Sequence, residues 1–154
     1  AGCGSIGLEA LKLSPNLDLF CIDKRIGSKA LILENSKRLG VKPKFIFEED
    51  INNTMKTRHF SSVDKPTRLV VGGCNKKTKL QIINSLAQEM NIGGIIIIPI
   101  IDIQTIKELK EKLESKNFKT TINLIQTYKS LSIAEGMRLE PNNPVFILKG
   151  KKLN

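Results

Sequence analysis

The amino-terminal segment contains a spaced set of glycines that is followed by one acidic side chain. Gly2, Gly4 and Gly7 match the G-x-G-x-x-G pattern, which lets a backbone pass close to a bound cofactor on the turn between a strand and a helix. Asp23 follows about 20 positions later, at the end of an apolar segment, where a carboxylate can accept hydrogen bonds from both hydroxyls of a ribose. The pattern predicts a nucleoside-cofactor site.

A second acidic residue could contact the base of such a cofactor. Asp50, with Ile51 directly after it, follows the apolar segment 44–47, where a carboxylate can accept a hydrogen bond from an adenine amino group. Solvated acids end many strands, and short glycine patterns arise by chance or in NAD-binding proteins. The prediction therefore depends on the glycine loop, Asp23 and Asp50 occurring together.

The elements that must position these residues alternate between helix and strand. Apolar periodicity predicts helices at 5–13, 25–39, 77–90 and 103–113, and strands at 17–22, 44–47, 68–71 and 95–101. The segment 51–65 is mixed and polar, with one short helix expected. Such alternation is typical of an α/β fold whose parallel strands are joined by right-handed crossovers.

The carboxyl-terminal part departs from this alternation. Segments 118–128 and 145–148 read as consecutive strands without a helix between them, joined by a polar loop at 129–143. Two such strands predict an antiparallel hairpin at one edge of a mostly parallel sheet. This ending favours the Rossmann-like class I S-adenosylmethionine-dependent methyltransferases, in which the cofactor lies across the carboxyl ends of the strands.

No strand precedes the glycine loop, although such a loop should follow the central strand of the sheet. We therefore expect the first strand to be missing, and residues 1–154 to form an N-terminally incomplete methyltransferase domain from a longer polypeptide.

Composition limits the partners. A formal net charge of +10 favours a polyanion, either a nucleic acid or a small molecule with many carboxylates, although abundant lysine can also reflect codon usage. The chain has one Tyr, no Trp, and Phe mostly within strand patterns, so no aromatic side chains that could stack on RNA bases are interleaved with the lysines, which disfavours a nucleic acid. Three cysteines in no paired spacing favour a reducing, cytoplasmic compartment. No apolar run is long enough to cross a bilayer, and no metal site is expected.

Three segments together resemble one family. They are the glycine loop and helix start at 1–10, the strand end Val-Val-Gly-Gly at 70–73, and the closing strand Asn-Pro-Val-Phe-Ile at 143–147. The chain resembles the precorrin-6Y methyltransferase (decarboxylating) family of cobalamin biosynthesis, specifically the domain that methylates carbon 15 of the macrocycle. The resemblance covers nearly the whole chain.

The resemblance implies methyl transfer from S-adenosylmethionine to a precorrin, with loss of carbon dioxide from an acetate side chain. It also implies a homo-oligomer such as a tetramer, and in some members a fused domain acting on carbon 5. The residues expected to bind the cofactor are Gly2, Gly4, Ser5, Asp23, Asp50, Ile51 and Gly72. Those expected to bind the acidic substrate are Gly73, Lys129 and Arg138.

Two other interpretations stay open from the residues alone. An RNA methyltransferase of the same fold would also suit the positive charge, but the segment 72–75 reads Gly-Gly-Cys-Asn and lacks an aromatic residue to grip a flipped base. A non-catalytic fragment or binding module is the second alternative. His59, the single histidine, is expected to be a surface or structural residue rather than a general base.

Overall fold

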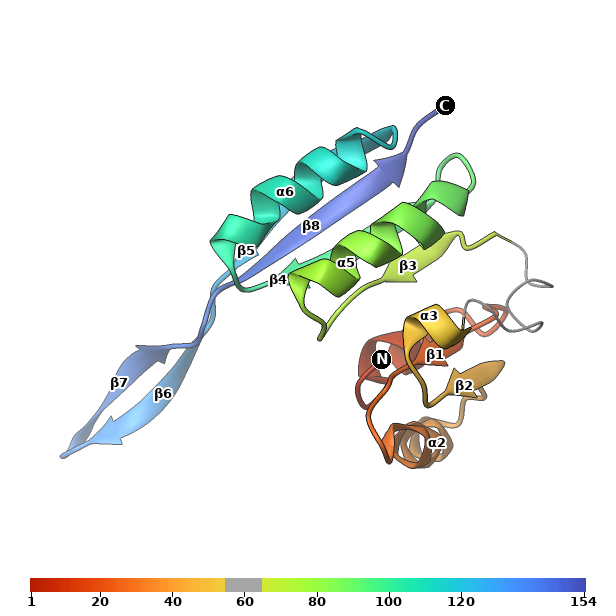
Figure 1. The fold of residues 1–154 in the computed structure, drawn as a ribbon. Helices are drawn as coiled ribbons and strands as arrows, with labels where there is room; N and C mark the ends of the chain where they lie inside the picture. The colour runs from red at the N-terminus through yellow and green to blue at the C-terminus, as the bar shows by residue number, and fades with distance from the viewer. Residues whose placement is uncertain (55–64) are drawn as a thin grey trace. The chain divides into compact units, whose positions relative to one another are not determined.

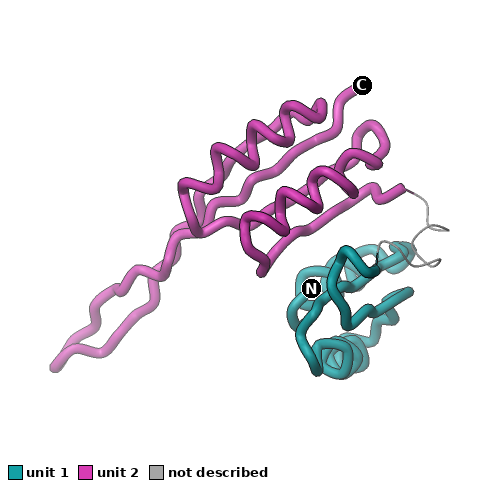
Figure 2. The backbone as a smooth tube through the Cα atoms, in the orientation of Figure 1, with its two compact units in different colours: residues 1–64 teal, residues 65–154 magenta. Residues whose placement is uncertain are grey.

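A computed structural model describes residues 1–54 and 65–154 of the chain. The backbone forms two compact units, residues 1–64 and 65–154, which are coloured separately in Figure 2. Each unit is described by itself. His59 and most of the mixed segment predicted at 51–65 lie outside the described residues.

The first unit is a small α/β arrangement. Its elements are α1 (Ser5–Leu13), β1 (Phe20–Ile22), α2 (Ser28–Leu39), β2 (Phe45–Phe47) and α3 (Ile51–Thr54). Strands β1 and β2 pair in parallel, with Cys21 opposite Ile46. Leu8 of α1, Cys21 of β1 and Ile32 of α2 are buried together and form the core of this unit. The predicted order of helix and strand is confirmed here.

Glycines set the ends of α2. The helix begins after Gly27, which has a φ of +83°, and ends at Gly40, which has a φ of +66°. A side chain is strained at such positive φ values, whereas glycine adopts them freely. The predicted stop at Gly40 is therefore confirmed, and the helix begins three residues later than predicted because the backbone at Gly27 is left-handed.

The second unit contains a four-stranded sheet. Its elements are β3 (Arg68–Val70), α5 (Lys76–Ile82), η1 (Ile83–Ala87), β4 (Ile95–Ile100), α6 (Ile103–Glu114), β5 (Phe118–Ile125), β6 (Tyr128–Ile133), β7 (Gly136–Pro141) and β8 (Val145–Lys152). The sheet order is β3-β4-β8-β5. Strands β3 and β4 are parallel, and β8 runs antiparallel to both of its neighbours. The predicted mixed sheet with an antiparallel ending is confirmed.

Helices α5 and α6 cover one face of this sheet (Figure 1). Strand β4 alternates buried and half-buried residues, as expected for one covered face, and Ile96 and Ile98 are fully buried. Leu109 and Leu113 of α6 are also fully buried. A Cβ at Gly150 of β8 would lie 3.0 Å from the Ile96 side chain, so the strand approaches its neighbours closely there. No helix in the described ranges is long and apolar enough to cross a membrane.

Two predictions about this unit are wrong. One concerns the type of helix and not its presence: the segment predicted as a helix at 77–90 is helical at 76–89, but residues 83–87 form the π-helix η1, which hydrophobic periodicity does not distinguish from an α-helix. The segment predicted as a polar loop, 129–143, contains β6 and β7, which pair antiparallel from Tyr128 opposite Pro141 to Ile133 opposite Gly136. This hairpin continues from the ends of β5 and β8 and projects away from the four-stranded sheet (Figure 1).

Candidate functional site

The glycine loop turns into α1 through two left-handed residues. Gly2 has a φ of +66° and Gly4 a φ of +82°. The Gly4 carbonyl accepts a hydrogen bond from the Leu8 amide at 2.8 Å, which begins the helix. A Cβ at Gly4 would lie 3.1 Å from Leu8 and 3.2 Å from Ile32, both of them core residues. Glycine is therefore required here by both backbone conformation and space. Ser5 follows as the exposed first residue of α1.

The carboxylate of Asp23 binds this loop directly. Asp23 follows β1, and its amide donates to the Phe47 carbonyl at 3.0 Å. Its Oδ2 accepts a hydrogen bond from the Gly2 amide at 2.6 Å and lies 3.1 Å from the amino group of Ala1. Its Oδ1 accepts from the amide and from Nε of Arg25, each at 3.0 Å. The structure thus brings Gly2 and Asp23 together, and their binding of a cofactor stays a prediction.

These donors change the acidity of Asp23. Partial burial acts to raise the pKa of the carboxyl group, but hydrogen bonds from Arg25 and Gly2 outweigh burial and hold the pKa well below its ordinary value. Asp23 is therefore ionised at neutral pH. An ionised carboxylate is the form that accepts hydrogen bonds from hydroxyl donors.

We expect Asp23 to make the stability of the protein depend on pH. Because its pKa is depressed in the folded protein, its contribution is present above its ordinary pKa of about 3.9 and is lost as the pH falls through the folded value. Asp23→Asn should lower the free energy of unfolding by about 1–3 kcal/mol at pH 7. Urea unfolding should show that the gap between wild type and variant narrows below about pH 4. A gap that stays constant with pH would contradict this assignment.

Asp50 follows β2 and caps the short helix α3. Its Oδ1 accepts hydrogen bonds from the Asn52 amide at 3.0 Å and from the Asn52 side chain at 2.9 Å. Ile51 is the first residue of α3 and is half-buried. The structure gives Asp50 a capping role, and adenine binding by Asp50 and Ile51 stays a prediction.

Gly72 and Gly73 lie in the second unit, in the loop that follows β3. Both are exposed, Gly73 has a φ of +64°, and a Cβ at either position would meet nothing within 4 Å. Asn75 ends this loop and caps α5 by accepting a hydrogen bond from the Thr78 amide at 2.9 Å. The loop therefore has an open outer side and a fixed attachment to the helix. We refer to residues 72–75 as the β3–α5 loop.

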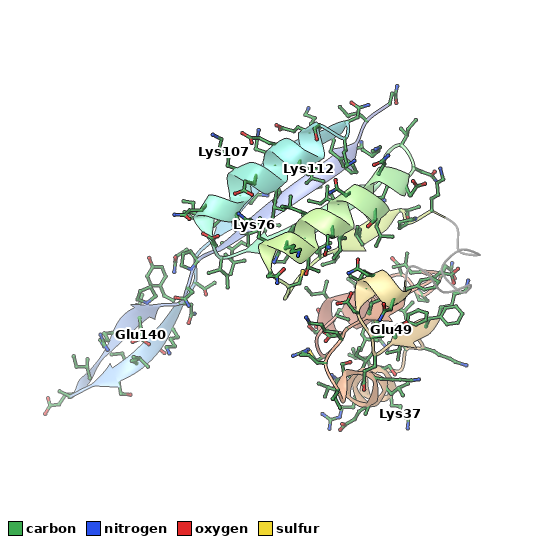
Figure 3. The ribbon with its side chains drawn as sticks, viewed as in Figure 1. Lys37, Glu49, Lys76, Lys107, Lys112 and Glu140 are labelled. Carbon is green, nitrogen blue, oxygen red and sulfur yellow. The ribbon has the colours of Figure 1, made fainter. Side chains whose placement is uncertain are left out.

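Lys129 and Arg138 lie on neighbouring strands of the β6–β7 hairpin. The Lys129 ammonium lies 2.9 Å from the Glu140 carboxylate, and the Arg138 guanidinium lies 3.8 Å from it. Both basic side chains are more than half exposed; Figure 3 labels Glu140 on the hairpin. The structure thus brings the two basic residues together around an acid that the sequence analysis did not consider. Their binding of a substrate stays a prediction.

Sequence reasoning also missed a buried charge behind the β3–α5 loop. Lys79 of α5 is 8% exposed, and its ammonium donates a hydrogen bond to the Cys74 carbonyl. A lysine in an amphipathic helix is normally a surface residue. The signal for its burial is its position three, four and seven residues before Ile82, Ile83 and Leu86, on the buried face of the helix. Within residues 1–54 and 65–154, no group of three or more His, Cys, Asp or Glu side chains could hold a metal ion.

The class of protein follows from the sheet and its glycine loop. In the second unit, one antiparallel strand is inserted next to the edge of a sheet of parallel strands. In the first unit, an acidic residue at the end of β1 accepts a hydrogen bond from a glycine turn. These two features are typical of the class I S-adenosylmethionine-dependent methyltransferase fold. Solved structures share it. A precorrin-6Y C5,15-methyltransferase from Geobacter metallireducens has a TM-score of 0.79 and 22% identity over 99% of this chain and 77% of its own. A precorrin-8W decarboxylase from Methanobacterium thermoautotrophicum has a TM-score of 0.77 and 21% identity over 96% of this chain and 76% of its own.

The family is narrower than the fold. A family model described as the precorrin methyltransferase domain matches residues 1–152, and the chain belongs to this family. A curated relative, the probable cobalt-precorrin-6B C(15)-methyltransferase (decarboxylating) of Methanosarcina mazei, is 24% identical over 151 residues, which cover 98% of this chain and 79% of the relative.

Proposed function

We propose that this protein transfers a methyl group from S-adenosylmethionine to carbon 15 of a precorrin, with decarboxylation of an acetate side chain, in cytoplasmic cobalamin biosynthesis. The observation that carries the proposal is the hydrogen bond from the Gly2 amide in the glycine loop to the Asp23 carboxylate, in a chain of the precorrin methyltransferase family. That hydrogen bond places an ionised acceptor beside the glycine turn.

The residues around Asp23 suit S-adenosylmethionine. Its sulfonium supplies an already activated methyl group, so the chain needs to orient the reactants more than to provide an acid and a base. Asp23 would accept the ribose hydroxyls, with the side chain of Arg25, which is 64% exposed, free to move off Oδ1. Gly2, Gly4 and Ser5 would present backbone to the cofactor. Gly72 and the adenine contacts of Asp50 and Ile51 complete the proposed binding set.

The charge of the chain suits an acidic substrate. A precorrin carries several acetate and propionate carboxylates, which are ionised at neutral pH. The net charge of +10 would attract such a molecule, and arginine can bind a carboxylate bidentately. We propose Gly73, Lys129 and Arg138 as the substrate-side residues.

Arg138→Ala should lower the turnover of a late precorrin while the affinity for S-adenosylmethionine stays nearly unchanged. A hydrogen bond to a charged group contributes about 1.5–3 kcal/mol, so we expect kcat/KM to fall about tenfold to a hundredfold. Arg38→Ala is the matched control, because Arg38 is 72% exposed and, like Arg138, lies near one glutamate. Equal effects of the two variants would remove Arg138 from the substrate site.

The decisive assay offers the wild-type protein a precorrin and bulk tRNA with labelled S-adenosylmethionine. We expect label and carbon dioxide release with the tetrapyrrole and no label in tRNA. Label in tRNA alone would assign the chain to RNA methylation, and label in neither would favour a binding module. The same assay on a chain extended at its amino end tests whether an upstream strand or a fused carbon-5 domain is needed.

We also propose that the β6–β7 hairpin pairs with a second copy of this chain. A two-stranded hairpin that packs against nothing else has marginal stability in water. This hairpin also exposes three large apolar side chains, Tyr128 (58% exposed), Met137 (79%) and Leu139 (69%), which a partner could cover. The register places all three on one face, which carries no charge. If two β7 strands pair antiparallel about Leu139, Arg138 of each copy lies opposite Glu140 of the other. This two-fold pairing would place Leu139 of both copies at the centre of the contact, with Arg138 and Glu140 paired on either side.

A further inference from the structure

The β3–α5 loop is held from beneath by one buried ammonium group. Lys79 is 8% exposed, and the described partner of its Nζ is the carbonyl of Cys74, five residues earlier in the chain. The backbone of the same residue is also tied to the loop, because its amide donates to the Asn75 carbonyl at 3.1 Å. Lys79 therefore fixes the end of the loop at two points.

The burial of this group requires a reason beyond packing. A buried ammonium loses its hydration, and an apolar residue of similar volume would fill the same space without that cost. The neighbouring Lys77, on the same helix, is exposed to solvent in the ordinary way. What Lys79 adds is a charge-assisted hydrogen bond that an apolar side chain cannot make.

The loop itself needs an external constraint. Gly72 and Gly73 are exposed, and Gly73 is left-handed with open space around it, so neither residue packs against neighbours that would limit its backbone. The half-buried Cys74 follows them directly. A hydrogen bond to its carbonyl restricts the loop on the inner side and leaves the outer side free for a ligand.

We propose that Lys79 is a positioning residue, which holds the β3–α5 loop in its binding conformation through the Cys74 carbonyl without touching a ligand. The proposal rests on the proposed function, because it assigns this loop to the methyl-transfer site through Gly72 and Gly73. Its consequence for catalysis is geometric, since a small displacement of a positioning loop can lower turnover strongly.

The test compares Lys79→Met, Lys79→Arg and the surface control Lys77→Met in the full chain. Lys79→Met removes the donor and keeps an unbranched side chain, so we expect it to fold. Amide hydrogen exchange at Thr78 and at position 79, both hydrogen-bonded to Asn75, should become about tenfold to a hundredfold faster. Lys79→Arg should restore slow exchange because guanidinium also donates, and Lys77→Met should match wild type.

Catalysis supplies the second measurement. Lys79→Met should reduce kcat for the precorrin while the melting temperature stays near that of wild type, and Lys79→Arg should recover part of the loss. Unchanged exchange in Lys79→Met would overturn the proposal, and so would an equal effect of Lys77→Met. If Lys79→Met does not fold, Lys79→Arg provides the test, because its guanidinium keeps a hydrogen-bond donor. Fast amide exchange in the loop of folded Lys79→Arg would then overturn the proposal. Absent precorrin turnover in wild type would refute the proposed function alone, because hydrogen exchange reads the loop without activity.

Discussion

Asp23→Ala is expected to weaken the binding of S-adenosylmethionine about tenfold to a hundredfold, or about 1.5–3 kcal/mol, in isothermal titration calorimetry. The variant removes an ionised acceptor that we assign to the ribose. It also removes the 2.6 Å hydrogen bond that fixes the Gly2 amide, so the glycine loop loses its tie to the end of β1. Both changes weaken the binding of S-adenosylmethionine, so among the variants considered we expect Asp23→Ala to lower the affinity for the cofactor most.

Asp18→Ala provides the control for the removal of one negative charge. Asp18 lies in the same unit, is 66% exposed, and pairs on the surface with Lys44. We expect its affinity for S-adenosylmethionine to equal that of wild type, because exposed ion pairs contribute little. An unchanged affinity in Asp23→Ala, or calorimetric binding of NAD in place of S-adenosylmethionine, would refute the proposed cofactor site.

Leu139→Glu is expected to convert an assembly of this chain into monomers. If β7 pairs with β7 of a second copy about Leu139, the substitution places two carboxylates at the two-fold axis. Like charges brought together in an interface cost several kcal/mol. Multi-angle light scattering should therefore show the monomer mass at concentrations where wild type is associated.

Ile92→Glu is the matched control, because Ile92 and Leu139 are each 69% exposed and lie in the same unit. It should leave the assembly intact. Arg138→Glu should also dissociate the copies, and the double variant Arg138→Glu with Glu140→Arg should restore them by exchanging the paired charges. A monomeric wild type, or Leu139→Glu that stays associated, would contradict the proposed pairing. Restoration by the double variant would place Arg138 in the contact between copies, and the turnover of Arg138→Ala tests its substrate role separately.

Much of the fold could be predicted from the sequence because most elements bury one face. Strand β4 is an isoleucine run, and α6 places its apolar residues on one side, so each has a clear period. The β6–β7 hairpin exposes both faces, which leaves no contrast between buried and exposed positions for a pattern to detect. The π-helix η1 shares its apolar stripe with the helix before it, so its boundary had no separate signal.

The candidate site was predictable where spacing constrains backbone geometry. Gly4 must be glycine for its positive φ and its contact with Ile32, and the distance along the chain from Gly2 to Asp23 is set by one helix and one strand. The contacts of Arg25 with Asp23 and of Lys79 with Cys74 depend on where long side chains turn. Such contacts are decided by tertiary packing. They cannot be predicted from composition or periodicity.

The placement of β8 has a consequence for the order in which the protein can fold during synthesis. In the described sheet, β5 pairs with β8 alone, and β8 fills the position between β5 and β4. Strand β5 therefore has no partner in this sheet until β8 has been synthesised and inserted between β5 and β4. Pairing strands distant in sequence is slow, and unpaired edges favour aggregation. Slow insertion of β8 would therefore prolong the interval in which β5 is unpaired, and a chaperone that shields β5 would reduce aggregation during that interval.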